Sequence, residues 1–253
     1  MTPINTNSWR HQNPHSKQPI INILILIVIN IYTLSIFVFQ EAKETMASEE
    51  AAQNVAQLTD KEKSTISEMM KAAQTLLNNS NIDNTERQLA TLSGGIKNCQ
   101  DRPILLNKTL DGFGSFVSDP SESIGGFDDG GFVHRAPSFN IPHLPGGGGG
   151  PGPVIIGCKA AVVYGTMDKA LPQLGWLLAW FKPQNSDQNK VYVEAGLLEE
   201  LMKKEWSEID AKLNASGSVS SYVDSSTGAV AAAQIEDQAH NLALLGATFS
   251  TLI

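Results

Sequence analysis

The amino-acid sequence predicts a mainly α-helical protein that an N-terminal transmembrane helix attaches to a membrane. Three observations lead to this prediction. Residues 20–39 form a run without a charged side chain, several later segments repeat apolar residues at helical spacing, and a glycine- and proline-rich stretch at 111–153 separates two groups of these segments. The expected fold class is therefore a membrane helix, a helical segment, a linker and a small, mostly helical C-terminal region with one short β-hairpin.

The composition is that of a folded protein with an acidic main part. Apolar residues make up 42% and charged residues 17% of the chain, which is close to the average of globular proteins. The net charge is −8, and because residues 1–45 carry +1, the rest of the chain carries −9. We therefore expect no nucleic-acid partner.

The N-terminal part divides into a polar tail and a membrane anchor. Residues 1–18 lack apolar periodicity, which predicts a disordered tail. Residues 19–40 are long enough to cross a bilayer as a signal anchor, because a helix of about twenty residues spans roughly 30 Å. Asn22 and Asn30 lie eight positions apart and share nearly one helical face, which suggests a route to a homo-oligomer.

Orientation and the true start of the protein leave three localisations open. Arg10 and Lys17 precede the span and Lys43 follows it, so the positive-inside rule places the C-terminal region outside the cytoplasm. Cleavage of the same segment as a signal peptide would give a secreted protein. Translation from Met46 would remove the span and give a soluble, cytoplasmic protein.

Residues 46–110 are expected to be helical. Thr59 and Glu62 have capping-box spacing at the start of a helix at 60–78. Its apolar positions are Ile66, Met69, Met70, Ala73, Leu76 and Leu77. A helix at 48–58 precedes it.

A further helix is predicted to begin near Asp83 and to end at Gly94 and Gly95, because paired glycines commonly end helices.

Residues 111–153 are predicted to be a flexible linker that divides the chain in two. Twelve glycines and six prolines among these residues leave little room for a regular element. Phenylalanines within the stretch suggest that it docks onto a protein partner. They are Phe113, Phe116, Phe127, Phe132 and Phe139.

Residues 154–253 are predicted to form the helical C-terminal region. Within it, Glu199 and Lys203, and Glu200 and Lys204, have the spacing of ion pairs along one helix. The expected elements are a hairpin of strands at 154–156 and 161–164 and helices at 168–181, 194–213 and 229–245.

Trp176 and Trp180 lie one turn apart in the predicted helix at 168–181, and Phe181 follows them. Aromatic rings near lysines suit a membrane interface, so these three side chains are candidates for lipid or partner contact. An interfacial helix would keep a charged face, which this segment lacks, so burial in a protein core is the favoured interpretation.

No pattern in the sequence predicts a catalytic, cofactor-binding or metal site. Asp128, Asp129, His134 and His143 could in principle hold a cation, but they fall in the predicted linker, which offers no rigid second shell. The glycines of residues 152–159 have the spacing of a phosphate loop but lack its lysine. No serine lies in a nucleophile elbow, so we expect no enzyme.

Cys99 and Cys158 are the two cysteines, and in an oxidising compartment they could form one disulfide.

These observations predict a single-pass, membrane-anchored binding protein. The alternatives are a secreted or membrane-active effector that uses the Trp176 and Trp180 helix, and a soluble protein that starts at Met46.

Overall fold

The computed structural model describes residues 58–80, 89–137, 157–167, 172–239 and 241–252. All of them belong to one compact unit of the chain, residues 51–253. The polar tail, the span at 19–40, the helix at 48–58, His143 and the glycine run at 146–150 lie outside the described residues. Among the residues that are described, no helix is both long and apolar enough to cross a membrane.

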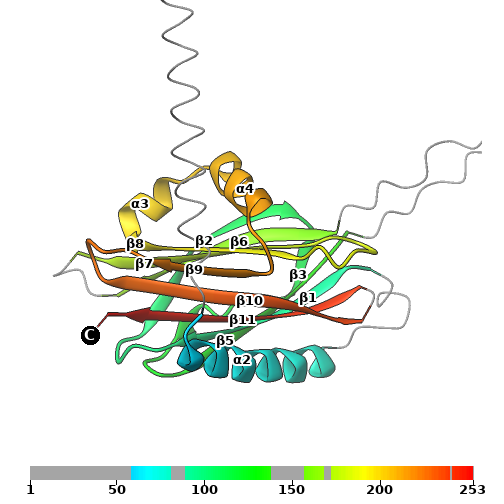
Figure 1. Cartoon of the computed structure of the whole chain (residues 1–253), viewed down its shortest axis with the longest axis horizontal. Helices are drawn as coiled ribbons and strands as arrows, with labels where there is room; N and C mark the ends of the chain where they lie inside the picture. Colours follow the sequence, from blue (N-terminus) through cyan, green and yellow to red (C-terminus); the bar gives the residue numbers. More distant parts are fainter. Residues whose placement is uncertain (1–57, 81–88, 138–156, 168–171, 240, 253) are drawn as a thin grey trace, which may run out of the picture. The chain divides into compact units, whose positions relative to one another are not determined.

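The described residues form a β-sandwich, so the predicted mainly α-helical fold class is wrong (Figure 1). A six-stranded sheet has the order β3-β5-β1-β11-β10-β9, and a five-stranded sheet has the order β4-β2-β6-β7-β8. Neighbouring strands are antiparallel except for the parallel pair β1 and β11 at the centre of the larger sheet. The strands are β1 (Thr91–Asn98), β2 (Ile104–Phe113), β3 (Ser115–Ser118), β4 (Ser123–Ile124), β5 (Asp129–Arg135), β6 (Cys158–Thr166), β7 (Leu174–Lys182), β8 (Lys190–Leu197), β9 (Val219–Val223), β10 (Ala229–Ala239) and β11 (Leu242–Thr251).

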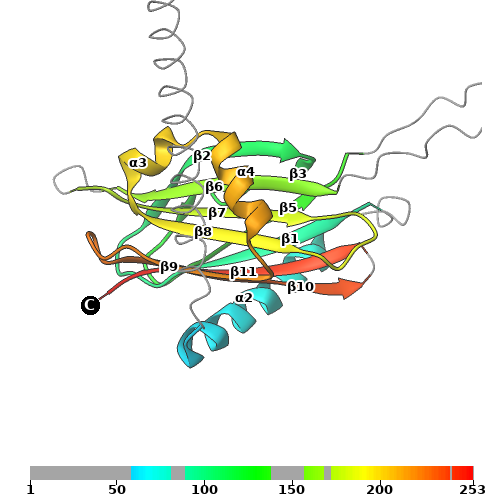
Figure 2. The ribbon, with the colours of Figure 1, turned by 45° about the horizontal axis from the view of Figure 1, so that its top comes forward.

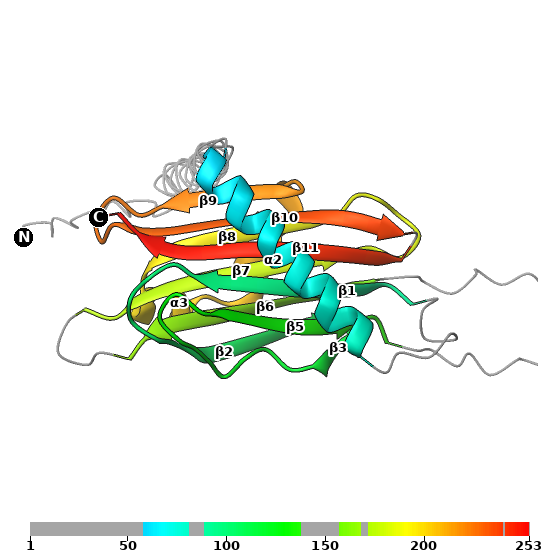
Figure 3. The same cartoon turned by 90° about the horizontal axis from the view of Figure 1, so that it is seen from below.

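Helices cover the outer faces of both sheets. α2 (Asp60–Asn79) lies across β1, β5 and β11 of the larger sheet (Figure 3), whereas α3 (Leu198–Lys203) and α4 (Trp206–Ala215) cover the smaller sheet (Figure 2). The main core lies between the sheets, and a second and a third apolar cluster lie beneath the helices. Strands in the middle of the sandwich are therefore buried on both faces.

Burial on both faces explains why three predicted helices are strands. β7 occupies most of the predicted helix at 168–181, and β10 and β11 occupy the predicted Ala-rich helix at 229–245. A strand buried on both faces shows a continuous apolar run instead of alternation, and such a run cannot be told from a buried helix by periodicity. Gly94 and Gly95 likewise lie inside β1 and do not end a helix.

The predicted division of the chain by a linker is also wrong. The described part of the glycine-rich stretch, residues 111–137, contains the end of β2 and the whole of β3, β4 and β5. Strands from before and after the stretch pair with each other, because β1 pairs with β11 and β2 pairs with β6. The two predicted parts are one folded unit. The predicted strand at 161–164 lies within β6, which pairs with β7, whereas the predicted strand at 154–156 lies outside the described residues.

The helix α2 confirms the prediction made for residues 60–78. Thr59 and Glu62 form the capping box, in which the Thr59 backbone N–H donates to the Glu62 carboxylate (2.7 Å) and the Glu62 N–H donates to the Thr59 hydroxyl (3.2 Å). The buried positions are Ile66, Met69, Met70, Ala73 and Leu77, which match the predicted apolar stripe.

The α2 helix approaches the larger sheet closely because glycines lie in the strands beneath it. Gly95 of β1 and Gly246 of β11 are register partners. A methyl group on either glycine would clash with a helix carbonyl, that of Met69 above Gly95 and that of Ile66 above Gly246. Beside them, the Ser93 hydroxyl donates to the carbonyl of Ala73 (2.8 Å). Helix and sheet backbones thus meet without intervening side chains.

A charged network fastens α3 and α4 to the smaller sheet. The buried Glu194 carboxylate accepts a hydrogen bond from the Tyr192 hydroxyl (2.6 Å) and pairs with Lys204 (3.0 Å). Lys159, also buried, pairs with Asp210 of α4 (2.7 Å). Lys212 of α4 also pairs with the Glu194 carboxylate (3.7 Å).

Of the two ion pairs predicted along the helix at 194–213, that between Glu199 and Lys203 forms (2.6 Å). Lys204 pairs with Glu194 and Glu208 and not with the predicted Glu200. The predicted helix itself divides into the end of β8, α3 and α4.

Replacing Gly246 by Ala tests the close packing of α2 against the larger sheet. The added methyl group must displace the Ile66 carbonyl, so the free energy of unfolding should fall by about 1–3 kcal/mol, as for overpacked cores. Gly217→Ala is the matched control, because a methyl group there meets nothing within 4 Å. Urea unfolding of both variants measures the difference. Equal stability of the two variants would contradict this close packing of helix and sheet.

Candidate functional site

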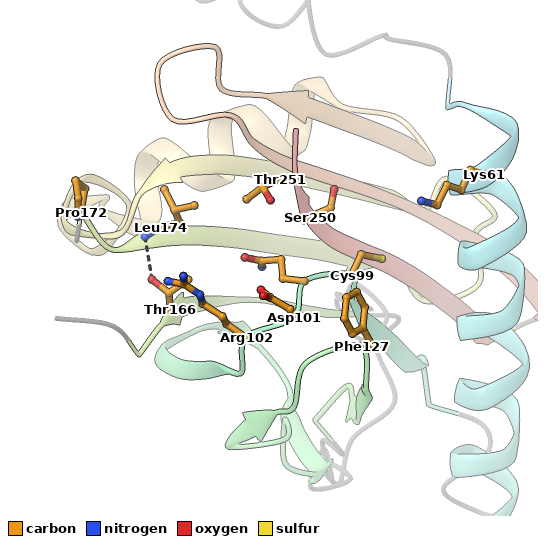
Figure 4. Close-up of a pocket in the computed structure, with 11 residues that line it drawn as sticks. Lys61, Cys99, Asp101, Arg102, Phe127, Thr166, Pro172, Leu174, Ser250 and Thr251 are labelled. Carbon is orange, nitrogen blue, oxygen red and sulfur yellow. Dashed lines mark hydrogen bonds between the residues drawn. The ribbon is translucent and has the colours of Figure 1, made fainter. Parts of the chain in front are cut away.

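A groove of about 600 Å³ opens at one end of the sandwich, where strands of both sheets finish (Figure 4). The β1–β2 loop, the β4–β5 loop, the β6–β7 connection, the end of β11 and the first turn of α2 surround it. Its lining is Lys61, Cys99, Gln100, Asp101, Arg102, Phe127, Thr166, Pro172, Leu174, Ser250 and Thr251. A volume of this size fits small-molecule sites, which span roughly 300–1,000 Å³.

Asn98 holds the two loops of one groove wall in place. Its buried side-chain amide donates to the carbonyls of Arg102 (2.7 Å) and Gly125 (2.9 Å), and its side-chain oxygen accepts from the Gln100 N–H (3.1 Å). The Phe127 N–H then donates to the Gln100 carbonyl (2.8 Å). One buried amide therefore organises both the β1–β2 and the β4–β5 loop.

Phe127 is presented to solvent by a strained backbone. Its φ of 60° lies in the left-handed region, which few residues other than glycine adopt. Its side chain is nonetheless 61% exposed, so burial does not compensate the strain. A strained, exposed and large apolar side chain at the rim of a groove is typical of a contact surface.

Three further apolar side chains are exposed at the same end. Met167 is 52% exposed and follows Thr166 of the lining, and Leu252 is 62% exposed and follows Thr251. Val223 is 49% exposed and pairs with Val230, which in turn pairs with Ser250 of the lining. Together with Phe127, these are the four most exposed large apolar side chains of the described residues.

The charged groups of the lining come from two elements. Lys61 reaches the groove from α2, and Arg102 reaches it from the β1–β2 loop, with the exposed Asp101 beside it (Figure 4). Two cations and one carboxylate give the lining a charge of +1, in a chain whose net charge is −8. Burial raises the pKa of the Cys99 thiol, so this side chain stays neutral.

The structure places Trp176 and Trp180 in β7, between the two sheets. Both indoles are 0% exposed, so the burial that the sequence favoured is confirmed, but in a strand and not in a helix. The Trp176 indole N–H donates to the carbonyls of Val230 (3.0 Å) and Ser250 (3.2 Å), which ties the core to the groove. Phe181 points to the opposite face of the strand and packs under α4.

The cysteines do not form the predicted disulfide. Both are free, and Cys99 lies at the groove whereas Cys158 begins β6. Thr166 of the groove ends the same strand, so Cys158 is roughly 26 Å from this end at about 3.3 Å per residue. A disulfide needs Cα atoms within about 7 Å. Burial also raises the pKa of Cys158 to about 12.

The acidic and histidine side chains of residues 128–134 do not converge. Asp129 pairs with Lys97 (2.6 Å), and His134 is buried in the core, where its Nδ1 accepts from the Trp180 indole N–H (3.1 Å). Within the described ranges, no group of three or more His, Cys, Asp or Glu side chains could hold a metal ion.

The chain is similar to known proteins both in sequence and in structure. A jasmonate-induced protein homolog from Atriplex canescens is 32% identical over 96 residues, which are 37% of this chain and 51% of that protein. The chain thus spans about half the length of this curated relative. The crystal structure of the lipid binding protein Nakanori covers 70% of this chain and 85% of its own, with a TM-score of 0.50 and 18% identity. This likeness shows a shared fold. No family model matches the chain.

Sequence reasoning missed the groove. Its residues come from segments as distant as Lys61 and Thr251, and no local spacing relates them. The one available signal was Phe127, as one of the five phenylalanines of the predicted linker that together suggested docking onto a protein partner. The polar groups Asn98 and Arg102 carry no pattern of their own.

Asn98→Ala tests whether one amide organises the groove wall. The substitution leaves the buried Ile124 carbonyl, the part-buried carbonyls of Arg102 and Gly125, and the Gln100 N–H without this partner, so we expect a loss of about 1–3 kcal/mol in the free energy of unfolding. Hydrogen exchange at the amides of Gln100 and Phe127 should accelerate, whereas that of β7 should not. Asn79→Ala, at an exposed helix end, is the control. Unchanged exchange at the two loop amides would contradict the role of Asn98.

His134 predicts a pH dependence of stability. Burial lowers the pKa of this imidazole to about 4 in the folded protein, from an ordinary value near 6.5. Between these values the unfolded chain binds a proton that the folded chain does not, so stability falls as the pH drops from 6.5 to 4, by about 3 kcal/mol. Urea unfolding across this range measures the slope. His134→Gln should flatten it, and an unchanged slope in that variant would assign the dependence to other groups.

Proposed function

We propose that this protein binds the surface of lipid membranes through the groove end of the sandwich. The observation that carries the proposal is the gathering of Phe127, Met167, Val223 and Leu252 at one end. Isolated apolar side chains on a surface are ordinary, but the four most exposed ones of the described residues gather at this end, where Phe127 lines the groove and Met167 and Leu252 directly follow lining residues. This arrangement suits a membrane interface, where apolar groups enter the acyl boundary while polar groups stay at the headgroups.

The chemistry of the groove supports the proposal. Two of the exposed apolar side chains directly follow a polar lining residue in the chain, Met167 after Thr166 and Leu252 after Thr251. A protein that bound a protein partner here would be expected to bury a more continuous apolar centre. Exposed apolar side chains next to a groove that also holds charged and hydroxyl groups match the layered polarity of a bilayer surface.

The structural relative supports the same direction. Nakanori is described as a lipid binding protein, and it shares the fold of this chain. Because 18% identity shows the fold alone, the proposal depends on the rim and the groove of this chain. The proposal places membrane contact on the sandwich itself, and the buried Trp176 indole supports the groove end from within, because its N–H donates to the Ser250 carbonyl of β11.

Phe127→Ser tests the proposal with Phe113→Ser as its matched control. Phe127 is 61% exposed at the groove, and Phe113 is 44% exposed at the end of β2, next to Gly114 and β3 and away from the groove lining. Transfer of a phenylalanine side chain into an apolar medium is worth about 1.5–3 kcal/mol, so Phe127→Ser should weaken vesicle binding about tenfold or more. Phe113→Ser should leave binding unchanged.

Sedimentation with vesicles of mixed phosphatidylcholine and anionic lipids measures the binding. The proposal fails when the unmodified protein stays in the supernatant at every lipid composition, or when both variants lose binding equally.

A further inference from the structure

We propose that the groove recognises the phosphorylated inositol headgroup of a phosphoinositide. This inference rests on the proposed membrane binding and names the class of lipid that the groove selects.

Two cations reach the groove from different parts of the fold. Lys61 stands in the first turn of α2, and Arg102 stands in the loop that Asn98 holds. Within the described residues the Lys61 ammonium forms no ion pair. Arg102 already interacts elsewhere in the chain, but a guanidinium carries five donors and can share them. Figure 4 shows the two side chains on different sides of the opening.

The remaining polar groups suit ring hydroxyls. The side chains of Thr166, Ser250 and Thr251 can donate and accept hydrogen bonds, and the exposed Asp101 carboxylate can only accept them. A carboxylate would oppose a simple phosphate ion, yet it fits a headgroup that presents hydroxyl donors between its phosphates. Separate cations, one acceptor carboxylate and several hydroxyls are together the complement of a phosphorylated polyol.

The dimensions and the charge are consistent with this ligand. A groove of about 600 Å³ leaves space for a six-membered ring with its substituents. The lining charge of +1 would attract an anionic headgroup to this end of a chain that is acidic elsewhere. The exposed Phe127 and Met167 would enter the bilayer beside the headgroup.

The experiment compares three vesicle compositions with the full chain. They are phosphatidylcholine alone, phosphatidylcholine with phosphatidylserine, and phosphatidylcholine with phosphatidylinositol 4,5-bisphosphate at the same total charge. We expect tighter binding to the third than to the second. Equal binding to the two anionic compositions, or binding to phosphatidylcholine alone that equals both, would overturn the inference while leaving the proposed membrane binding intact. Binding to none of the three would overturn both.

Substitutions of charged residues test whether the groove is the site that recognises the headgroup. Lys61→Gln and Arg102→Gln should each weaken binding to the bisphosphate vesicles by about fivefold, as expected for one cation near a membrane surface. Lys71→Gln removes the same charge from an exposed position ten residues further along α2, away from the groove, and should leave binding unchanged. An equal loss in all three variants would show a response to total charge and would overturn the headgroup site.

Soluble inositol 1,4,5-trisphosphate separates the two sources of this headgroup. It should displace the protein from bisphosphate vesicles, but only at concentrations well above those of the accessible lipid, because the free headgroup lacks the contacts of Phe127 and Met167. Failure to compete would overturn the groove as the site of recognition. Competition by equimolar free ligand would overturn the lipid as its natural source.

Discussion

Burial of the central strands on both faces is the constraint on which the rest of this structure depends. Each sheet packs against the other on its inner face and against a helix on its outer face, so β6 and β7 are apolar along nearly their whole length. Two large indoles, those of Trp176 and Trp180, fill the inner layer. The outer layers require helices that approach closely, which the paired Gly95 and Gly246 permit on one side and the Glu194 network holds on the other.

The groove lies at the end of the sandwich, where the core between the two sheets ends. Strands of both sheets end together, and the loops that leave them must satisfy their backbone groups without a neighbouring strand. The Asn98 side chain forms hydrogen bonds with backbone groups of two loops at once. The Trp176 indole N–H donates to a backbone carbonyl near the end of β11. The wall is thus held rigidly enough to keep Phe127 exposed in a left-handed conformation. A rigid scaffold that exposes apolar side chains next to a groove with charged and hydroxyl groups is suited to the reversible membrane contact proposed above.

The distribution of charge separates this end from the rest of the molecule. An acidic chain would be repelled by an anionic bilayer if its charges were uniform, but the lining of the groove is positive. The likeness to Nakanori shows a shared fold, so the membrane contact proposed for this chain depends on its own groove and on the apolar side chains beside it. Membrane contact was expected from the sequence too, through a span at residues 19–40 that lies outside the described part of the chain. The surface that we propose for membrane contact is a different one, the groove end of the sandwich.

The sequence by itself determined the features that depend on neighbouring residues. The capping box of Thr59 and Glu62, the apolar stripe of α2 and the pair of Glu199 and Lys203 were all predicted, because each depends on positions three or four apart. Burial of the two indoles was predicted from hydrophobicity alone. The tertiary structure decided the rest. Whether an apolar run becomes a strand or a helix depends on what covers its two faces, and the groove unites residues from α2 to β11 that no spacing connects.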